Sequence, residues 1–389
     1  MTTFEKPRLE IAEIFEKFDY LLGPLAPEQR KVIQDIKNCR TKILGGHRLK
    51  CDSCEQEKNA YNSCRNRHCP KCQFLAQTKW IEKRMEDLLP CQYFHVVFTV
   101  PSELRPLILR NKKVCYNILF KAASQTLKEV AANADHLVAE IGCIGVLHTW
   151  GQNLLDHPHI HFIVPGGGLS KDKTKWVPCK PDFLLPLRVL SKVFRGKVLE
   201  FLDVAFNKNK LKLLGQIAPL SSPPIFKDLL IDCAVKEFVV YAKESFAGPE
   251  AVIKYLGQYT HRMAISNYRL VKLEDEKVHF RIRDPENPRK KKVLALPVVE
   301  FMRRFLLHVL PRQYMRIRHF GMLGSRIKKM KISIVRQLQG VKEKVTQTAD
   351  QCWKALLKKT TDIVADLCPH CKTGSLQIVA RLWPLINSS

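Results

Sequence analysis

Apolar positions near the N-terminus repeat at the spacing of helices. One apolar face runs through residues 8–22, where the helix is predicted to end before Pro24. A second short helix is expected to begin at Pro27, because a proline ring suits the first helical turn. Residues 73–89 show the helical repeat again. We therefore expect a helical segment at the start and another helix after a cysteine-rich stretch.

The segments that follow predict a sheet. Residues 93–101 are β-branched and aromatic and end in proline, which favours a strand. A helical pattern over residues 113–133 precedes two further strand patterns, at about 139–150 and 157–165. Only a short turn separates these two strands, and strands joined in this way pair antiparallel. We therefore expect them to form a hairpin.

The second half of the chain alternates helix and strand patterns. Residues 186–214 look largely helical, and residues 238–241 favour a strand. Gly248 is expected to open a helix that carries Tyr255 and Tyr259, which four-residue spacing places one above the other. Taken alone, such a pair is more often structural than catalytic.

These patterns divide the chain into four predicted parts. A helical segment spans residues 1–45 and a zinc-binding domain spans residues 46–90. A nuclease-like domain follows over residues 91–275, and residues 276–389 form a basic C-terminal region with a single CxxC pair.

Charge indicates the kind of partner. With 65 Lys and Arg against 37 Asp and Glu, the net charge is +28 and the pI is about 9.7, which on a folded chain favours nucleic acid. Residues 301–341 contain many basic residues and no acid, and the loop at 63–68 is also basic. Stretches of this kind suit DNA phosphates. The arginines expected to contact them are Arg65, Arg67, Arg303, Arg304, Arg316 and Arg318.

The fourteen cysteines favour metal binding over disulfides. The sequence has no apolar run long enough to span a membrane and no apolar signal core at its start, so we expect a cytoplasmic protein with reduced thiols. Two CxxC pairs, Cys51 with Cys54 and Cys69 with Cys72, offer four thiolates that could surround one structural Zn²⁺.

Other metal-binding side chains lie near these pairs and in the tail. Cys64, His68 and His47 could replace a ligand or serve a second metal, although packing around the zinc is the stronger expectation. Cys368 and Cys371 form a lone CxxC pair, which cannot close a tetrahedral site. Such a pair would need a ligand from elsewhere, for example His370 or Cys352, or it would bind no metal.

Alternate histidines mark the strand predicted at 157–165. Side chains two residues apart in a strand point the same way, so His159 and His161 would converge on one point. The hairpin would bring His148 beside them as a third ligand of a divalent metal. On ligand softness alone Zn²⁺ is favoured over Mg²⁺ or Mn²⁺. His157 is expected to support the site, and the weaker candidates are Asp156, Gln152 and His95.

The order of cysteine pairs, histidine strand and paired tyrosines resembles the rolling-circle insertion-sequence transposases. This is the two-tyrosine HUH family with an N-terminal transposase zinc-binding domain. The likeness covers roughly residues 8–330 and is carried by the segments 61–72, 94–101, 157–161, 255–262 and 303–311.

The resemblance implies a fold and a mechanism. The fold would be α+β, with a central antiparallel sheet of the HUH-endonuclease type (ferredoxin-like or RRM-like) and surrounding helices, preceded by the helical segment and a small zinc knuckle. Mg²⁺ or Mn²⁺ on His148, His159 and His161 would polarise the scissile phosphate of single-stranded DNA at the element ends. Tyr255 and Tyr259 would form 5′-phosphotyrosine links, so that joining to target DNA needs no ATP.

The same resemblance suggests supporting residues and a location. His261 or Arg262 would steady the phosphate, and the enzyme would work at the nucleoid. Three other functions fit parts of the pattern: an HUH replication initiator or relaxase, a non-catalytic zinc-dependent DNA-binding protein, and a metallohydrolase. The last has only Asp156 as an evident general base. The zinc knuckle favours the transposase.

Overall fold

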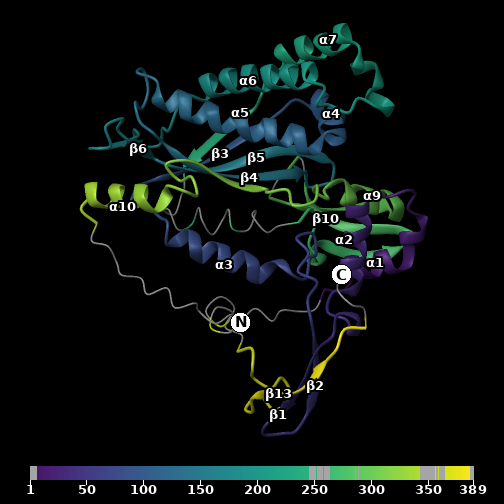
Figure 1. Cartoon of the computed structure of the whole chain (residues 1–389). Helices are drawn as coiled ribbons and strands as arrows, with labels where there is room; N and C mark the ends of the chain where they lie inside the picture. Colours follow the sequence, from purple (N-terminus) through teal and green to yellow (C-terminus); the bar gives the residue numbers. More distant parts are fainter. Residues whose placement is uncertain are drawn as a thin grey trace.

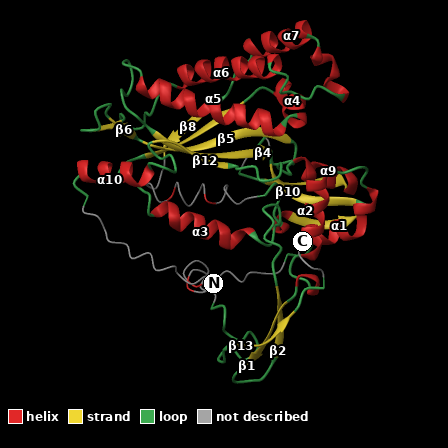
Figure 2. Cartoon of the chain, viewed as in Figure 1, coloured by secondary structure: helices red, strands yellow, loops and turns green. Residues whose placement is uncertain are grey.

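The computed structural model describes residues 7–244, 251, 257, 263–284, 286–287, 289–341, 355, 358 and 364–385. Its centre is a five-stranded sheet in the order β12-β4-β5-β3-β8, in which every pairing is antiparallel (Figure 2). Its strands are β3 (Tyr93–Thr99), β4 (Gly142–Trp150), β5 (Asp156–Pro165), β8 (Val240–Glu244) and β12 (Ile317–Gly321). The predicted fold class and the predicted hairpin are therefore confirmed.

The two faces of this sheet have different surroundings because side chains alternate along each strand. Phe94, Val96 and Phe98 of β3 point into the main apolar core, together with Phe162 of β5. Two long helices, α5 (Lys112–Ala132) and α6 (Leu187–Asn207), cover this face (Figure 1). Shorter helices complete the layer: α4 (Arg105–Arg110) and α7 (Pro223–Ala234).

The opposite face is covered by helices at one end. There α3 (Gln73–Met85) and α10 (Lys328–Leu338) lie against a smaller apolar cluster that includes Ile144 and Ile163 of the central strands (Figure 1). The ion pair between Lys328 and Asp87, 2.6 Å long, joins α10 to the segment after α3. The other end of this face carries the histidines.

A second core joins the start of the chain to its second half. Helices α1 (Ile11–Phe18) and α2 (Pro27–Asn38) share it with α9 (Val298–Leu307) and a sheet of three strands, namely β9 (Leu270–Glu274), β10 (Lys277–Arg283) and β11 (Lys291–Pro297). The rings of Phe15 and Phe305 meet edge to face at 5.7 Å. Residues 1–45 and 276–389, predicted as separate parts, thus contribute to one core.

An early hairpin and a late strand of the chain also meet in a protruding arm. A third sheet has the order β13-β1-β2 and consists of β1 (Gly46–Cys51), β2 (Glu57–Tyr61) and β13 (Leu376–Leu382). In Figure 1 the yellow C-terminal strand lies beside the purple N-terminal hairpin. A small hairpin of β6 (Gly167–Leu169) and β7 (Trp176–Pro178) follows β5. None of the helices in the described ranges combines the length and apolar character that a membrane crossing needs.

Candidate active site

The three predicted histidines lie together on the open face of the central sheet. In the antiparallel register of β4 and β5, His148 pairs with His159 and Val146 pairs with His161. Paired residues face the same way, so the three imidazoles converge. One ring nitrogen from each histidine lies within 4.8 Å of the others. This spacing suits three ligands of one metal ion.

Burial favours the neutral form of His159 and His161. His148 and His161 are only 3% and 7% exposed. Burial lowers the pKa of His159 to about 4 and holds the pKa of His161 well below its ordinary value, with the neighbouring histidines adding to the second effect. A neutral imidazole has the free lone pair that a metal needs. The site is therefore ready to bind a cation at neutral pH.

Hydrogen bonds orient two of the rings. His159 donates from Nδ1 to the carbonyl oxygen of His157 at 2.6 Å, which leaves its Nε2 as the free lone pair. Nδ1 of His161 lies 2.7 Å from Nε2 of His95, and these two rings stack in parallel. His95, a weaker candidate ligand in the sequence, therefore lies beside His161, one of the three predicted ligands.

The remaining sequence candidates lie farther out. His157 stands next to Arg105, whose Nη2 is 3.4 Å from its Nδ1. Alternation along β5 turns Asp156 away from the three histidines, and burial raises its pKa to about 6, although the nearby charges of Lys112 and Arg105 oppose this shift. Gln152 is exposed in the turn between β4 and β5.

The predicted nucleophiles Tyr255 and Tyr259, together with Arg262, lie outside the described residues. The last described strand before them is β8 at the sheet edge, where Tyr241 pairs with Val97 and Val97 in turn pairs with His161. The described chain after them resumes at Met263.

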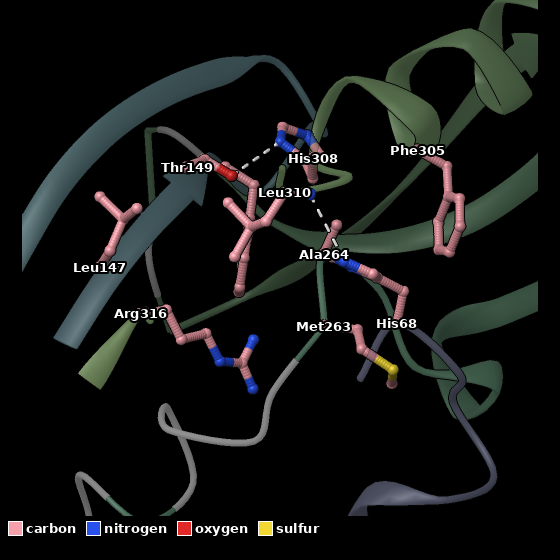
Figure 3. Close-up of a pocket in the computed structure, with 10 residues that line it drawn as sticks. His68, Leu147, Thr149, Met263, Ala264, Phe305, His308, Leu310 and Arg316 are labelled. Carbon is pink, nitrogen blue, oxygen red and sulfur yellow. Dashed lines mark hydrogen bonds between the residues drawn. The ribbon is translucent and has the colours of Figure 1, made fainter. Parts of the chain in front are cut away.

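Met263 lines a pocket between the end of β4 and α9 (Figure 3). His308 bridges its walls: Nδ1 is 3.1 Å from Oγ1 of Thr149, and Nε2 is 3.0 Å from the carbonyl oxygen of Leu154. The buried guanidinium of Arg316 reaches the same pocket, and burial lowers its pKa to about 10, so that it still carries its charge at neutral pH. The ring of Trp150 stacks on His148 and connects this pocket to the histidine site.

The cysteines form two clusters, and the predicted grouping of Cys51, Cys54, Cys69 and Cys72 is not the one found. Cys69 and Cys72 lie with Cys64, which the sequence offered only as a replacement ligand, and with Cys39, which it did not indicate. We call this set the N-terminal cluster: Cys39, Cys64, Cys69 and Cys72. The other pair meets the tail in a set we call the shared cluster: Cys51, Cys54, Cys368 and Cys371.

The hairpin of β1 and β2 explains this separation. It carries Cys51 and Cys54 out into the arm, while its base brings the flanking segments together through a hydrogen bond from Arg40 N to Asn62 O of 3.0 Å. Cys39 and Cys64 therefore become neighbours. In the N-terminal cluster Sγ of Cys72 lies 3.3 Å from that of Cys39 and 3.6 Å from that of Cys64. The sequence signal for this grouping is one cysteine on each side of the hairpin, Cys39 before β1 and Cys64 after β2.

Many of the predicted DNA-binding arginines already have protein partners. Arg303 and Arg304 both bind Glu300 at 2.6 Å, and Arg67 donates to the carbonyl oxygen of Tyr314. Arg318 donates to Asn117 and covers the ring of Phe120. Among the described arginines of the predicted set, Arg65 and Arg303 are exposed, and Arg303 is already paired with Glu300.

Known proteins match most of the sequence. Residues 142–331 match the family described as "Putative transposase", and residues 11–100 match the one described as "Transposase zinc-binding domain". "Putative transposase y4qJ" of Sinorhizobium fredii (strain NBRC 101917 / NGR234) is 45% identical over 373 residues, which cover 94% of each chain. "Transposase for insertion sequence element IS801" of Pseudomonas savastanoi pv. phaseolicola is 25% identical over 321 residues, covering 78% of this chain and 72% of the relative. No solved structure matches.

The matched ranges coincide with the features described above. The first contains both histidine strands, and the second contains the whole N-terminal cluster. Cys368 and Cys371 of the shared cluster lie outside both.

Proposed function

The chain belongs to the IS91-type family of insertion-sequence transposases, enzymes that cut and join DNA, and we propose that it does so through a tyrosine nucleophile and a His-liganded metal ion. In this proposal it nicks and rejoins single-stranded DNA through a 5′-phosphotyrosine intermediate and drives rolling-circle transposition.

The convergence of His148, His159 and His161 is the observation that carries the proposal. Three imidazoles from two paired strands form a set of ligands, and among the described residues no fourth cysteine, histidine or carboxylate joins them to close a structural site. Bound there, Mg²⁺ or Mn²⁺ would polarise the scissile phosphate. His95 and the carbonyl of His157 hold two of the rings in the orientation that binding needs.

We assign the nucleophilic role to Tyr255 and Tyr259. The hydroxyl oxygen attacks the phosphorus, the new O–P bond replaces the bond to the 3′-oxygen, and the leaving 3′-oxygen takes up a proton. One phosphodiester bond is exchanged for another, so rejoining needs no external energy. A tyrosine hydroxyl, with a pKa near 10, leaves more readily than a serine hydroxyl. Two tyrosines allow two strand transfers in alternation.

The N-terminal cluster fits the zinc of the matched zinc-binding domain. Four thiols with sulfur separations of 3.3 and 3.6 Å approach the roughly 3.8 Å that tetrahedral zinc with Zn–S bonds of about 2.3 Å requires. The cluster fixes the basic loop that carries Arg65, which is exposed toward solvent. We propose that this loop contacts the DNA backbone and that His261 or Arg262 steadies the scissile phosphate.

The proposal is tested by following each half of the cut strand. Single-stranded oligonucleotides from the element ends, labelled at the 5′ or the 3′ terminus, are incubated with the protein and Mn²⁺ and then denatured. The 3′-labelled product should stay on the protein, and the 5′-labelled product should be released with a free 3′-hydroxyl. Tyr255→Phe combined with Tyr259→Phe should abolish the adduct, whereas Tyr268→Phe, an exposed tyrosine elsewhere, should retain it. Cleavage with no adduct would instead indicate a metallohydrolase, and DNA binding without cleavage would indicate a regulator.

A further inference from the structure

The tail of the chain returns to the N-terminal arm and pairs with it. β13 runs antiparallel to β1, with Gly46 opposite Leu382 and Cys51 opposite Leu376. Beyond the strands, Asp52 N donates to Ser375 O at 3.1 Å, and Ser375 N donates to Asp52 Oδ1 at 2.8 Å. This pairing places the CxxC pair of the tail directly against the first CxxC pair of the chain.

We propose that the shared cluster is a second structural zinc site, built half from the N-terminal hairpin and half from the C-terminal tail. Sγ of Cys51 lies 3.7 Å from Sγ of Cys371, and Sγ of Cys54 lies 3.7 Å from Sγ of Cys368. All four sulfur atoms lie within 4.8 Å of one another. Tetrahedral zinc with bonds of about 2.3 Å sets sulfurs about 3.8 Å apart.

The backbone of both pairs is shaped for thiolate ligands. The residue after the second cysteine has a left-handed conformation in each pair, with φ of 56° at Glu55 and 61° at Lys372. Backbone amides point at the sulfurs: Ser53 N lies 3.5 Å from Sγ of Cys51, and Gly374 N lies 3.3 Å from Sγ of Cys371. Such donors stabilise the charge of a bound thiolate.

Gly374 shows how closely the two halves fit. A Cβ at this position would lie 2.4 Å from Sγ of Cys51 and 2.6 Å from Oγ of Ser53. Only a residue without a side chain allows the tail to approach the first pair so closely. This close approach lets the tail, although far from the first CxxC pair in the sequence, complete the site.

Disulfides do not account for this arrangement. A disulfide needs sulfurs about 2.05 Å apart and joins two cysteines, whereas here two sulfur pairs are each 3.7 Å apart and all four sulfurs lie within 4.8 Å of one another. Of the two further ligands considered for the tail, His370 does not belong to the cluster, and Cys352 lies outside the described residues. Four convergent thiols in a DNA-processing enzyme therefore favour zinc.

The site would fasten the tail to the body of the enzyme. The central residues of β13 are exposed, so the strand adds little apolar burial. A short strand with one paired edge and little buried surface is marginal in water, and metal binding supplies folding energy to small domains of this kind. We therefore infer that order in residues 364–385 depends on the second zinc ion.

Metal content of the full-length protein tests this inference. The wild type should carry two zinc ions per chain, measured by inductively coupled plasma mass spectrometry. Cys368→Ser with Cys371→Ser should carry one, as should Cys51→Ser with Cys54→Ser. Changing all four should remove no further zinc, because the two pairs share one ion. Cys91→Ser with Cys179→Ser, two cysteines outside both clusters, should keep two.

A second measurement on the wild type guards against misfolded variants. Mild chelation should speed amide hydrogen exchange in residues 376–382 and 46–51 together, while the buried strands of the central sheet stay protected. The inference is overturned if the tail variant retains two zinc ions, if the wild type binds only one, or if chelation leaves exchange in β13 unchanged.

Discussion

Individual imidazoles decide what the histidine site can bind. His159 combines a free Nε2 with a fixed ring, and its pKa near 4 keeps it neutral at working pH. We expect His159→Ala to lower Mn²⁺-dependent cleavage by about 1000-fold or more, because the loss of metal activation removes several kcal/mol of transition-state stabilisation. Affinity for single-stranded DNA should change less than about twofold.

The matched control for this change is His279→Ala. His279 lies on β10 in the three-stranded sheet, half-buried and away from the central sheet. Cleavage should persist in this variant. Equal losses in the two histidine variants, or a loss of DNA binding with His159→Ala, would mean that the histidine holds the fold and not a metal ion.

His95 is expected to act as a positioning residue. It contacts His161 and not the metal position itself, so its role is to fix that ring. We expect His95→Ala to weaken Mn²⁺ binding by about 10- to 100-fold in calorimetric titrations. His95→Gln, which keeps a donor, should recover part of the affinity. Val97→Ala, on the same face of β3, serves as the control, and unchanged Mn²⁺ affinity in His95→Ala would refute this role.

At the scale of elements, α10 carries both buried and exposed lysines of the basic stretch at 301–341. Lys331 is buried and pairs with Glu140 at 2.7 Å, whereas Lys329 on the same helix is exposed. We expect Lys331→Ala to destabilise the fold by about 1 kcal/mol, since Glu140 remains partly hydrated. Lys329→Ala should leave the melting temperature unchanged and lower the salt dependence of DNA binding by up to about 0.7 in the log–log slope.

Melting curves and binding titrations at several salt concentrations distinguish these two effects. If Lys329→Ala leaves both the affinity for single-stranded DNA and its salt dependence unchanged, α10 does not face the DNA. If Lys331→Ala changes the salt slope but not the melting temperature, its ion pair is not structural.

The secondary-structure elements also show how much of the fold and of the candidate site could be predicted from the sequence. The hairpin of β4 and β5 was predictable because it is local: a short turn and alternation along two strands suffice to join His148 with His159 and His161. The cysteine grouping was not, because it depends on the pairing of Cys51 with Cys371, 320 positions away. The nearest CxxC pairs appeared to be partners, but the hairpin of β1 and β2 carries the first pair away from the second. Likewise, a basic stretch of sequence shows where charge lies, but it does not show which glutamate or backbone carbonyl each arginine binds.

At the scale of the whole molecule, buried histidines couple stability to pH. Burial lowers the pKa of His308 and His319 to about 4 and that of His68 to about 3. The unfolded chain, with ordinary values near 6.5, binds more protons between about pH 6.5 and 4, so stability is full above this window and falls as the pH drops through it. Asp156 acts in the opposite sense because its pKa is raised.

His308 offers a test of this coupling. From pH 7.5 to 5.5 its protonation in the unfolded state should cost about 1 kcal/mol of stability. His308→Gln should therefore show a smaller loss of unfolding free energy over this range than the wild type, whatever its stability at pH 7.5. A loss as large as that of the wild type would show that His308 does not contribute to the pH dependence.

The central claim concerns which atom attacks the DNA, and mapping the covalent adduct tests it most directly. The trapped complex is digested with protease and nuclease, and the modified peptide is sequenced by mass spectrometry. We predict a nucleotide joined through its 5′-phosphate to Tyr255 or Tyr259. A nucleotide on Tyr241, the exposed tyrosine of β8 in register with His161, or a linkage through a 3′-phosphate, would contradict the account.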